Sequence, residues 1–282
     1  MRLILLTVLT MLAFAANSIL TRMAIEGGHI DPSSFAVIRI VAGAVALTMI
    51  LILRGGRLPL FERARIVGAL SLACYMIGFS LAYATLDAGL GALILFGVVQ
   101  VTIFVYGALR GAVPSPRQLS GAGVAFIGLI IALWPSEGST SSVAGTALMV
   151  VAGLGWAAYT LAGWGATNPL AATAANFVLA TPLLLVILIG QSLNADVVGI
   201  GLAILCGAVT SGLGYSLWYS VLPKMTSTTA AIVQLSVPII AIGAGAIFLG
   251  EAVGIVIIIA ATLVVGGIAL AVTTRSVPKD RT

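Results

Sequence analysis

The best candidates for binding a ligand in this sequence are aromatic side chains that recur at helical spacing. Tyr75, Phe79 and Tyr83 are separated by four residues, so a helix would place them on one face. Two further groups are spaced in a similar way: Trp156 with Tyr159, and Tyr215 with Trp218 and Tyr219. Tyr and Trp often gather at membrane interfaces, whereas a buried Tyr hydroxyl needs a partner that a polar cavity can supply. The pattern indicates the lining of a cavity, with simple helix packing as the alternative.

Amides and one arginine are the other polar groups within apolar sequence. Asn17, Gln100 and Gln234 could each hydrogen-bond a substrate, or could tie neighbouring helices together. Arg39 lies six residues inside an apolar segment, where it could bind a substrate carboxylate. We favour the other interpretation, in which Arg39 is a structural charge that reaches carbonyls or Glu251 at the outer surface.

Catalytic and metal-binding patterns are missing from the sequence. Its single histidine, His29, lies in a predicted loop, and Asp and Glu occur only near the ends of the apolar segments. Intramembrane enzymes need buried acid pairs, Ser–His or Cys–His sets, or metal ligands. We therefore expect no enzymatic activity, no metal and no cofactor. A channel would need a ring of carbonyls or charges, and no segment resembles such a filter.

The composition indicates a polytopic membrane protein. Hydrophobic residues make up 61% of the 282 residues and charged residues 7%, whereas soluble domains contain about 25% charged residues. The apolar stretches are continuous, which is typical of helices rather than of a membrane β-barrel. The 13 Lys and Arg are scattered along the chain, so we expect no nucleic-acid partner. The expected partners are the lipid bilayer and a small-molecule substrate.

Ten transmembrane helices are predicted between the charges, prolines and polar clusters, since a bilayer core requires about 20 apolar residues per helix. They cover residues 3–24, 33–53, 66–86, 88–109, 118–134, 144–166, 170–190, 197–221, 227–249 and 253–273. Pro182 and Pro238 fall within two of them and predict kinks that could act as gating hinges or be static. A signal peptide that ends at Ala13-Phe14-Ala15 is an alternative interpretation of the first segment.

The basic residues orient these segments. If the N-terminus is cytoplasmic, all 13 Lys and Arg except Arg22 and Arg39 fall on the cytoplasmic side, as the positive-inside rule requires. The eleven are Arg2, Arg54, Arg57, Arg63, Arg65, Arg110, Arg117, Lys224, Arg275, Lys279 and Arg281. We therefore expect a multi-pass protein of the bacterial inner membrane with both termini in the cytoplasm.

Weak internal similarity divides this single transmembrane domain, residues 1–282, into two five-helix repeats, residues 1–135 and 142–275. Residues 14–17 (FAAN) resemble residues 156–159 (WAAY), and Phe79 and Tyr83 precede Tyr215 and Tyr219 by the same interval. Because five is odd, the second repeat would enter the membrane from the opposite side. Such inverted repeats are widely used by secondary transporters.

Several short motifs carry a family resemblance. The second half contains Thr228-Thr229-Ala230-Ala231, then Pro238, Gly250-Glu251 and Gly266-Gly267, and the first half contains residues 35–39 (FAVIR). With these motifs the chain resembles the drug/metabolite transporter superfamily of the EamA type, and among its members bacterial amino-acid exporters. The resemblance implies ten helices in two five-helix repeats, and export of small metabolites by alternating access through a central cavity between the halves. Amino acids, above all aromatic and other apolar ones, are the favoured cargo.

Two classes of cargo fit the sequence. Quaternary-ammonium or other drug-like compounds are the alternative cargo, because an aromatic cage can hold a cation without a carboxylate. A monomer is compatible with the expected architecture.

Overall fold

The structure, a computed structural model, describes residues 2–110, 115–133, 143–164, 166–190, 193–225, 230 and 233–272. Parts of the sequence motifs (Thr228, Thr229, Ala231) and three basic residues (Arg275, Lys279, Arg281) lie outside these ranges. The first half forms α1 (Arg2–Glu26), α2 (Pro32–Leu53), α3 (Arg63–Ala82), α4 (Ala88–Leu109) and α5 (Pro116–Leu133). The second half forms α6 (Val143–Gly163), α7 (Pro169–Leu185), α8 (Val197–Leu205), α9 (Gly214–Val221), α11 (Ser236–Phe248) and α12 (Ile255–Val272).

Helix length and hydropathy support the prediction of a polytopic membrane protein. Seven helical stretches are long and apolar enough to cross a membrane, in α1 to α4, α6, Pro169–Leu188 and Val197–Lys224. Three shorter apolar helices, Pro116–Ala132, Ser236–Phe248 and Ile255–Ala271, overlap the predicted fifth, ninth and tenth segments. The count of ten spans stays a prediction.

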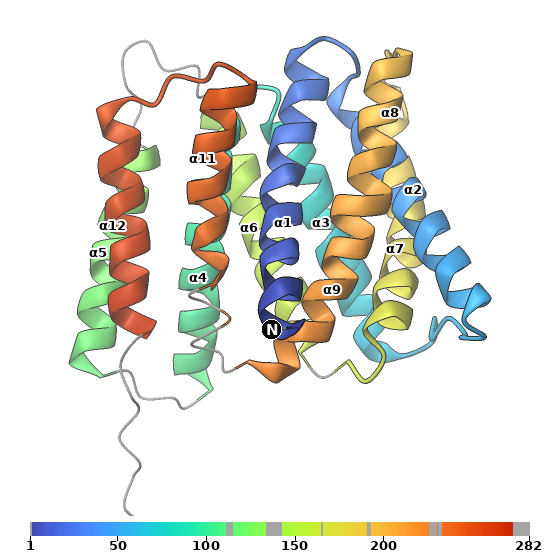
Figure 1. The fold of residues 1–282 in the computed structure, drawn as a ribbon, viewed down its shortest axis with the longest axis horizontal. Helices are drawn as coiled ribbons and strands as arrows, with labels where there is room; N and C mark the ends of the chain where they lie inside the picture. The colour runs from blue at the N-terminus through green and yellow to red at the C-terminus, as the bar shows by residue number, and fades with distance from the viewer. Residues whose placement is uncertain are drawn as a thin grey trace, which may run out of the picture.

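The helices stand side by side in one bundle, with α1 near its centre (Figure 1). The closest neighbours are α5 with α12, α3 with α6, and α2 with α7. The chain begins at the end of the bundle where α12 finishes (Figure 1). We call the opposite end, where α1 finishes and α2 begins, the α1–α2 end.

The surface of the bundle is apolar, as lipid contact requires. Val45, Met49 and Ile52 form a stripe on α2 and are each more than half exposed. The opposite face of the same helix buries Arg39 and Leu47 completely. The exposed face of α2 is thus apolar and its one charge lies on the buried face, whereas a helix of a soluble protein carries its charges on the exposed face.

The acidic residues that the structure describes lie at helix ends or in turns. Asp31, Asp87 and Asp196 occupy the N-cap positions of α2, α4 and α8. Asp31 accepts a hydrogen bond from the backbone N of Ser34, a favourable cap for the N–H groups that a helix start leaves unpaired. Asp31 also accepts from the backbone N of Asn194, so it joins the α1–α2 loop to the loop before α8.

Helices α2 and α7 start in the same way. Asn168 caps α7 by accepting from the backbone N of Ala171, and both caps are followed by a proline at the first helical turn. Proline is favoured there because its φ is already helical and no N–H bond is lost.

Two helices are interrupted in their course through the bundle. Residues 206–213, between α8 and α9, form a π-helical segment that the sequence did not predict. Pro182 lies inside α7, which ends in a 3₁₀ turn at Val186–Leu188. Pro238 was placed within a continuous span, but α11 begins only at Ser236. Pro238 therefore lies in the first turn of α11, where a missing N–H costs no intrahelical hydrogen bond.

Candidate substrate site

Aromatic rings from four helices meet in the middle of the bundle. Trp156 of α6 is their centre, with its ring 5.0 Å from the ring of Tyr75, 4.6 Å from Tyr215 and 5.3 Å from Phe14. Phe79 packs on Tyr75 at 5.1 Å. All five are buried, with exposures of 4% or less. Edge-on and tilted arrangements dominate, which the charge distribution of aromatic rings favours.

A small cavity lies among these rings. It is lined by residues of α1, α3, α4, α6 and α9: Phe14, Asn17, Ser18, Tyr75, Phe79, Leu95, Phe96, Trp156 and Tyr215. The free space in it holds about one water molecule. A larger ligand can therefore enter only if the surrounding helices separate, so this conformation is closed around the cavity.

Arg39 of α2 is hydrogen-bonded to three residues that line this cavity, Asn17, Tyr75 and Tyr215. Its Nε donates to Ser211 Oγ at 2.8 Å, and its Nη2 donates to the hydroxyls of Tyr215 at 2.8 Å and Tyr75 at 3.1 Å. A longer bond of 3.3 Å reaches Asn17 Oδ1. The guanidinium carbon is 4.8 Å from the centre of the Phe79 ring. The charge is fully buried and is held by neutral groups from α1, α3, α9 and the π-helical segment.

Asn17 gathers donors on its side-chain oxygen. Ser211 and Thr210 hydroxyls donate to Asn17 Oδ1 at 2.8 Å each, and the Cys206 thiol approaches it at 3.2 Å. The wide turn of the π-helical segment brings these three residues to one acceptor. Asn17 is thus the point where α1 is tied to both Arg39 and the segment between α8 and α9.

The structure brings only some of the predicted site residues to the cavity. Asn17, Tyr75, Phe79, Trp156 and Tyr215 line it. Three other predicted aromatics form the next layer of the core: Tyr83 against Phe79, Tyr159 against Trp156, and Trp218 against Phe14.

The two predicted glutamines lie away from the cavity lining. Gln234 donates to the carbonyl of Ala230, and Gln100 is buried within α4.

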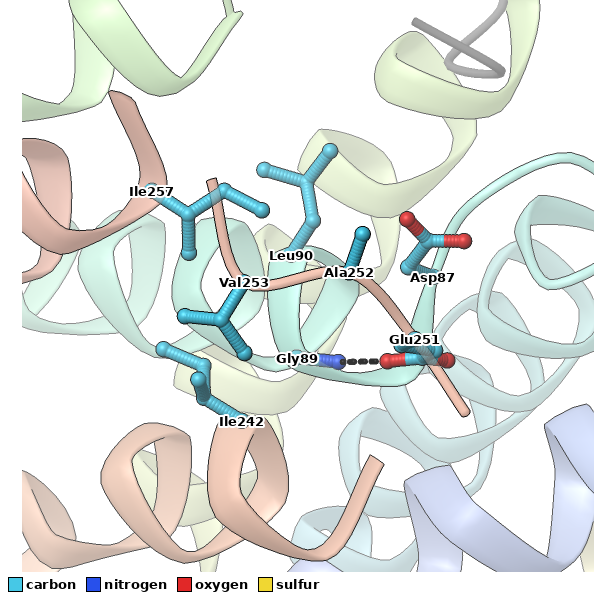
Figure 2. Close-up of a pocket in the computed structure, with 8 residues that line it drawn as sticks. All are labelled: Asp87, Gly89, Leu90, Ile242, Glu251, Ala252, Val253 and Ile257. Carbon is cyan, nitrogen blue, oxygen red and sulfur yellow. Dashed lines mark hydrogen bonds between the residues drawn. The ribbon is translucent and has the colours of Figure 1, made fainter. Parts of the chain in front are cut away.

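The predicted contact between Arg39 and Glu251 is wrong. Arg22 of α1 takes that place: it pairs with Glu26 at 2.9 Å and Asp87 at 3.3 Å, and approaches Glu251 to 4.0 Å. Glu251 accepts from the backbone N atoms at the start of α4, including Gly89 at 3.2 Å (Figure 2). Arg39 cannot reach this cluster because it is held deeper in the bundle by the cavity residues.

This cluster lies at the α1–α2 end of the bundle. The four charged residues come from α1, from the start of α4 and from the turn between α11 and α12. Burial raises the pKa of Glu251, although the hydrogen bonds from the backbone of α4 lower it in part.

Sequence reasoning missed several members of the site. Phe14 and Phe96 complete the aromatic lining, Ser18 lies beside Asn17 in it, and Ser211 holds Arg39. Phe14 is three residues before Asn17, a spacing that places both on one helix face. No comparable signal marks Ser211, because its role depends on the π-helical turn.

Comparisons with known proteins extend this description. The EamA-like transporter family matches residues 143–273. An uncharacterised protein of Pseudomonas aeruginosa is 45% identical over 277 residues, which cover 97% of this chain and 96% of that protein. An uncharacterised transporter of Archaeoglobus fulgidus is 25% identical over 255 residues, 87% of this chain and 90% of that protein. One crystal structure shares the fold with a TM-score of 0.68 at 16% identity, covering 96% of this chain and 97% of the other.

Proposed function

The chain belongs to the EamA-like transporter family, and from that premise we propose that it exports amino acids and related small metabolites across a bacterial inner membrane. Aromatic and other apolar amino acids are the favoured cargo. The observation that carries this proposal is the closed cavity in the middle of the bundle, with aromatic walls and polar groups at one side. Aromatic walls suit an apolar side chain, and the polar groups suit the charged end of an amino acid.

The packing of the helices supports transport by two inverted repeats. If the repeats correspond, α1 matches α6, α2 matches α7, α3 matches α8–α9, α4 matches α11, and α5 matches α12. Under this correspondence, the pair α3 and α6 in one arrangement is equivalent to the pair α8–α9 and α1 in the other. The pair α4 and α6 is likewise equivalent to the pair α11 and α1. All four pairs are in contact in the structure. The pairs α2 with α7, α4 with α11 and α5 with α12 map onto themselves.

The similar starts of α2 and α7 also support the correspondence of the two repeats. Each begins with a capping Asx residue and a proline, and each carries a buried polar residue seven positions after that proline, Arg39 and Asn176. In such folds the two halves exchange conformations, which opens the site to one side of the membrane and then to the other. We propose that the chain works in this way, with both termini in the cytoplasm and as a monomer.

The alternative cargo, a quaternary-ammonium compound, is less compatible with this cavity. A cation would need the faces of aromatic rings. Tyr75 and Phe79 already have the Arg39 guanidinium over them, with its carbon 5.5 and 4.8 Å from the ring centres. A second cation beside the same rings would meet a positive charge.

Counterflow of radiolabelled phenylalanine in proteoliposomes tests the proposed function. Replacing Phe79 or Trp156 by Ala should weaken apparent affinity about two- to tenfold for each aromatic pair that the substitution removes, since such a pair is worth about 0.5–1.5 kcal/mol. Phe126→Ala, on the exposed face of α5, is the matched control and should transport normally. If both cavity variants behave like this control, the cavity is not the cargo site.

A further inference from the structure

The buried charge of Arg39 has no acidic partner among the residues that the structure describes. Ion pairs in those ranges involve Arg22, His29 and Arg65, and Arg39 contacts only neutral oxygens and ring faces. A buried charge in a protein is normally paired with an opposite charge. Asp and Glu are placed at the ends of helices in the described ranges, so the middle of the bundle is left with a positive charge.

The site also has buried hydrogen-bond donors that lack an acceptor. Arg39 Nη1 and Trp156 Nε1 are buried donors with no acceptor within reach. The acceptors that hold Arg39 are shared among several donors: Asn17 Oδ1 accepts from Arg39 and from the donors of the π-helical segment, and the Tyr75 and Tyr215 hydroxyls both accept from Arg39. Buried donors are rarely left unpaired. The site therefore offers two unpaired donors and a positive charge to a ligand.

A purely structural role explains only part of this arrangement. Arg39 does link α2 to α1, α3 and α9, and its Nε and Nη2 atoms are accounted for by those links. The Nη1 atom contributes to none of them. A ligand carboxylate would supply the missing charge and the missing acceptors together, because guanidinium and carboxylate pair through charge-assisted hydrogen bonds.

We infer that the cavity recognises a carboxylate attached to an apolar body, with Arg39 as its ligand, and that it does not require the ammonium group of an amino acid. This inference rests on the proposed function and narrows its cargo to apolar carboxylates, amino acids among them. The apolar body packs against Trp156 and Phe79, and the carboxylate accepts from Arg39. Apolar acids without an ammonium group bind at least as tightly as the matching amino acid, because the described residues around the cavity include no acidic group to pair with the ammonium.

Three ligands that share one phenyl ring test the inference on the purified full-length protein at neutral pH. They are 3-phenylpropionate (carboxylate alone), L-phenylalanine (both charges) and phenethylamine (ammonium alone). Binding is followed by quenching of tryptophan fluorescence, since Trp156 lines the cavity. We expect 3-phenylpropionate to bind at least as tightly as phenylalanine, and phenethylamine to bind at least tenfold more weakly.

Substitutions then test whether Arg39 is the residue that binds the carboxylate. Arg39→Gln should weaken both carboxylates at least tenfold and leave phenethylamine unchanged, whereas Arg39→Lys should retain part of the carboxylate affinity. Arg110→Gln removes a positive charge at the exposed end of α4 and should bind like the unmodified protein. Equal loss of carboxylate binding in Arg110→Gln would show a general charge effect and contradict the assignment to Arg39.

The ligand series on the unmodified protein decides the matter even if the Arg39 variants do not fold. Phenethylamine binding as tightly as 3-phenylpropionate overturns the inference, and so does a failure of 3-phenylpropionate to bind. If phenylalanine counterflow persists in either case, the proposed function stands without this narrower cargo class. If that flux is absent as well, the proposed function fails with it.

Discussion

The close packing of α3 on α6 depends on a glycine that can be tested by adding one methyl group. A Cβ atom at Gly155 of α6 would lie 2.8 Å from the backbone N of Tyr75 and 2.9 Å from the carbonyl O of Ser71. Ordinary van der Waals distances begin at 3.4 Å. Both obstructing atoms belong to the backbone of α3, so Gly155→Ala can be accommodated only if the two helices move apart.

The expected cost follows from this geometry. Overpacking of a well-packed core typically costs about 1–3 kcal/mol, and the better helix propensity of Ala offsets about 0.5–1 kcal/mol of it. A net loss of about 1–2 kcal/mol corresponds to a fall in thermal midpoint of about 2–4 °C per kcal/mol for chains near this size. Because α3 carries Tyr75 and Phe79, apparent affinity for phenylalanine should fall as well.

Thermal unfolding of the purified protein in detergent measures this effect. Gly201→Ala is the matched control, because a Cβ there meets no atom within 4 Å, and it should be neutral or slightly stabilising. If Gly155→Ala unfolds at the same temperature as Gly201→Ala and transports normally, α3 and α6 do not approach each other as described.

Three further predictions concern orientation, coupling and pH. Single cysteines at Asp31 and Asp196, in a background without Cys74 and Cys206, should react with an impermeant thiol reagent from outside, and one at Arg57 should not; the reverse pattern would invert the topology. Each described acid lies at a helix end or in a turn, where it is not placed to carry protons through the middle of the bundle. Phenylalanine flux should therefore need only a substrate gradient. Strict dependence on an imposed proton gradient would contradict facilitated transport. Since the pKa of Glu251 is raised above its ordinary value of 4.5, its stabilising contribution should be present below pH 4.5 and be lost as pH rises through the raised pKa. The thermal midpoint of the unmodified protein should fall relative to Glu251→Gln over that interval, and parallel pH curves would refute the shift.

Much of the fold follows from hydropathy, because the interior of a bilayer restricts the chain to helices whose apolar length is set by the membrane. The predicted boundaries of the second segment, 33–53, differ by one residue at the start from α2, Pro32–Leu53. The aromatic cluster was also predictable: Tyr75, Phe79, Trp156 and Tyr215 do meet in one core.

Other features depend on tertiary geometry that a local pattern does not contain. The sequence showed that Arg39 was deep in its segment, but its partners lie 22 to 176 residues away in the chain. Arg22 is the residue that reaches the acids at the α1–α2 end. Of its three carboxylate neighbours, Glu26 is in the same helix, whereas Asp87 and Glu251 are far away in the chain. The π-helical segment also escaped prediction, since residues 206–213 are as apolar as an α-helical stretch.

That π-helical segment has a consequence for how the site can change in evolution. In a regular α-helix Cys206 and Thr210 would share a face, and Ser211 would point about 100° away from Thr210 and about 140° away from Cys206. The wider turn lets all three reach Asn17 Oδ1 at 3.2, 2.8 and 2.8 Å. A point substitution here removes one donor, whereas deletion of a single residue would restore the α-helical register and re-aim Ser211 together with Tyr215 beyond it. Relatives that differ by one residue in the length of this turn would therefore present a differently composed cavity to their cargo, even if every side chain in it were the same.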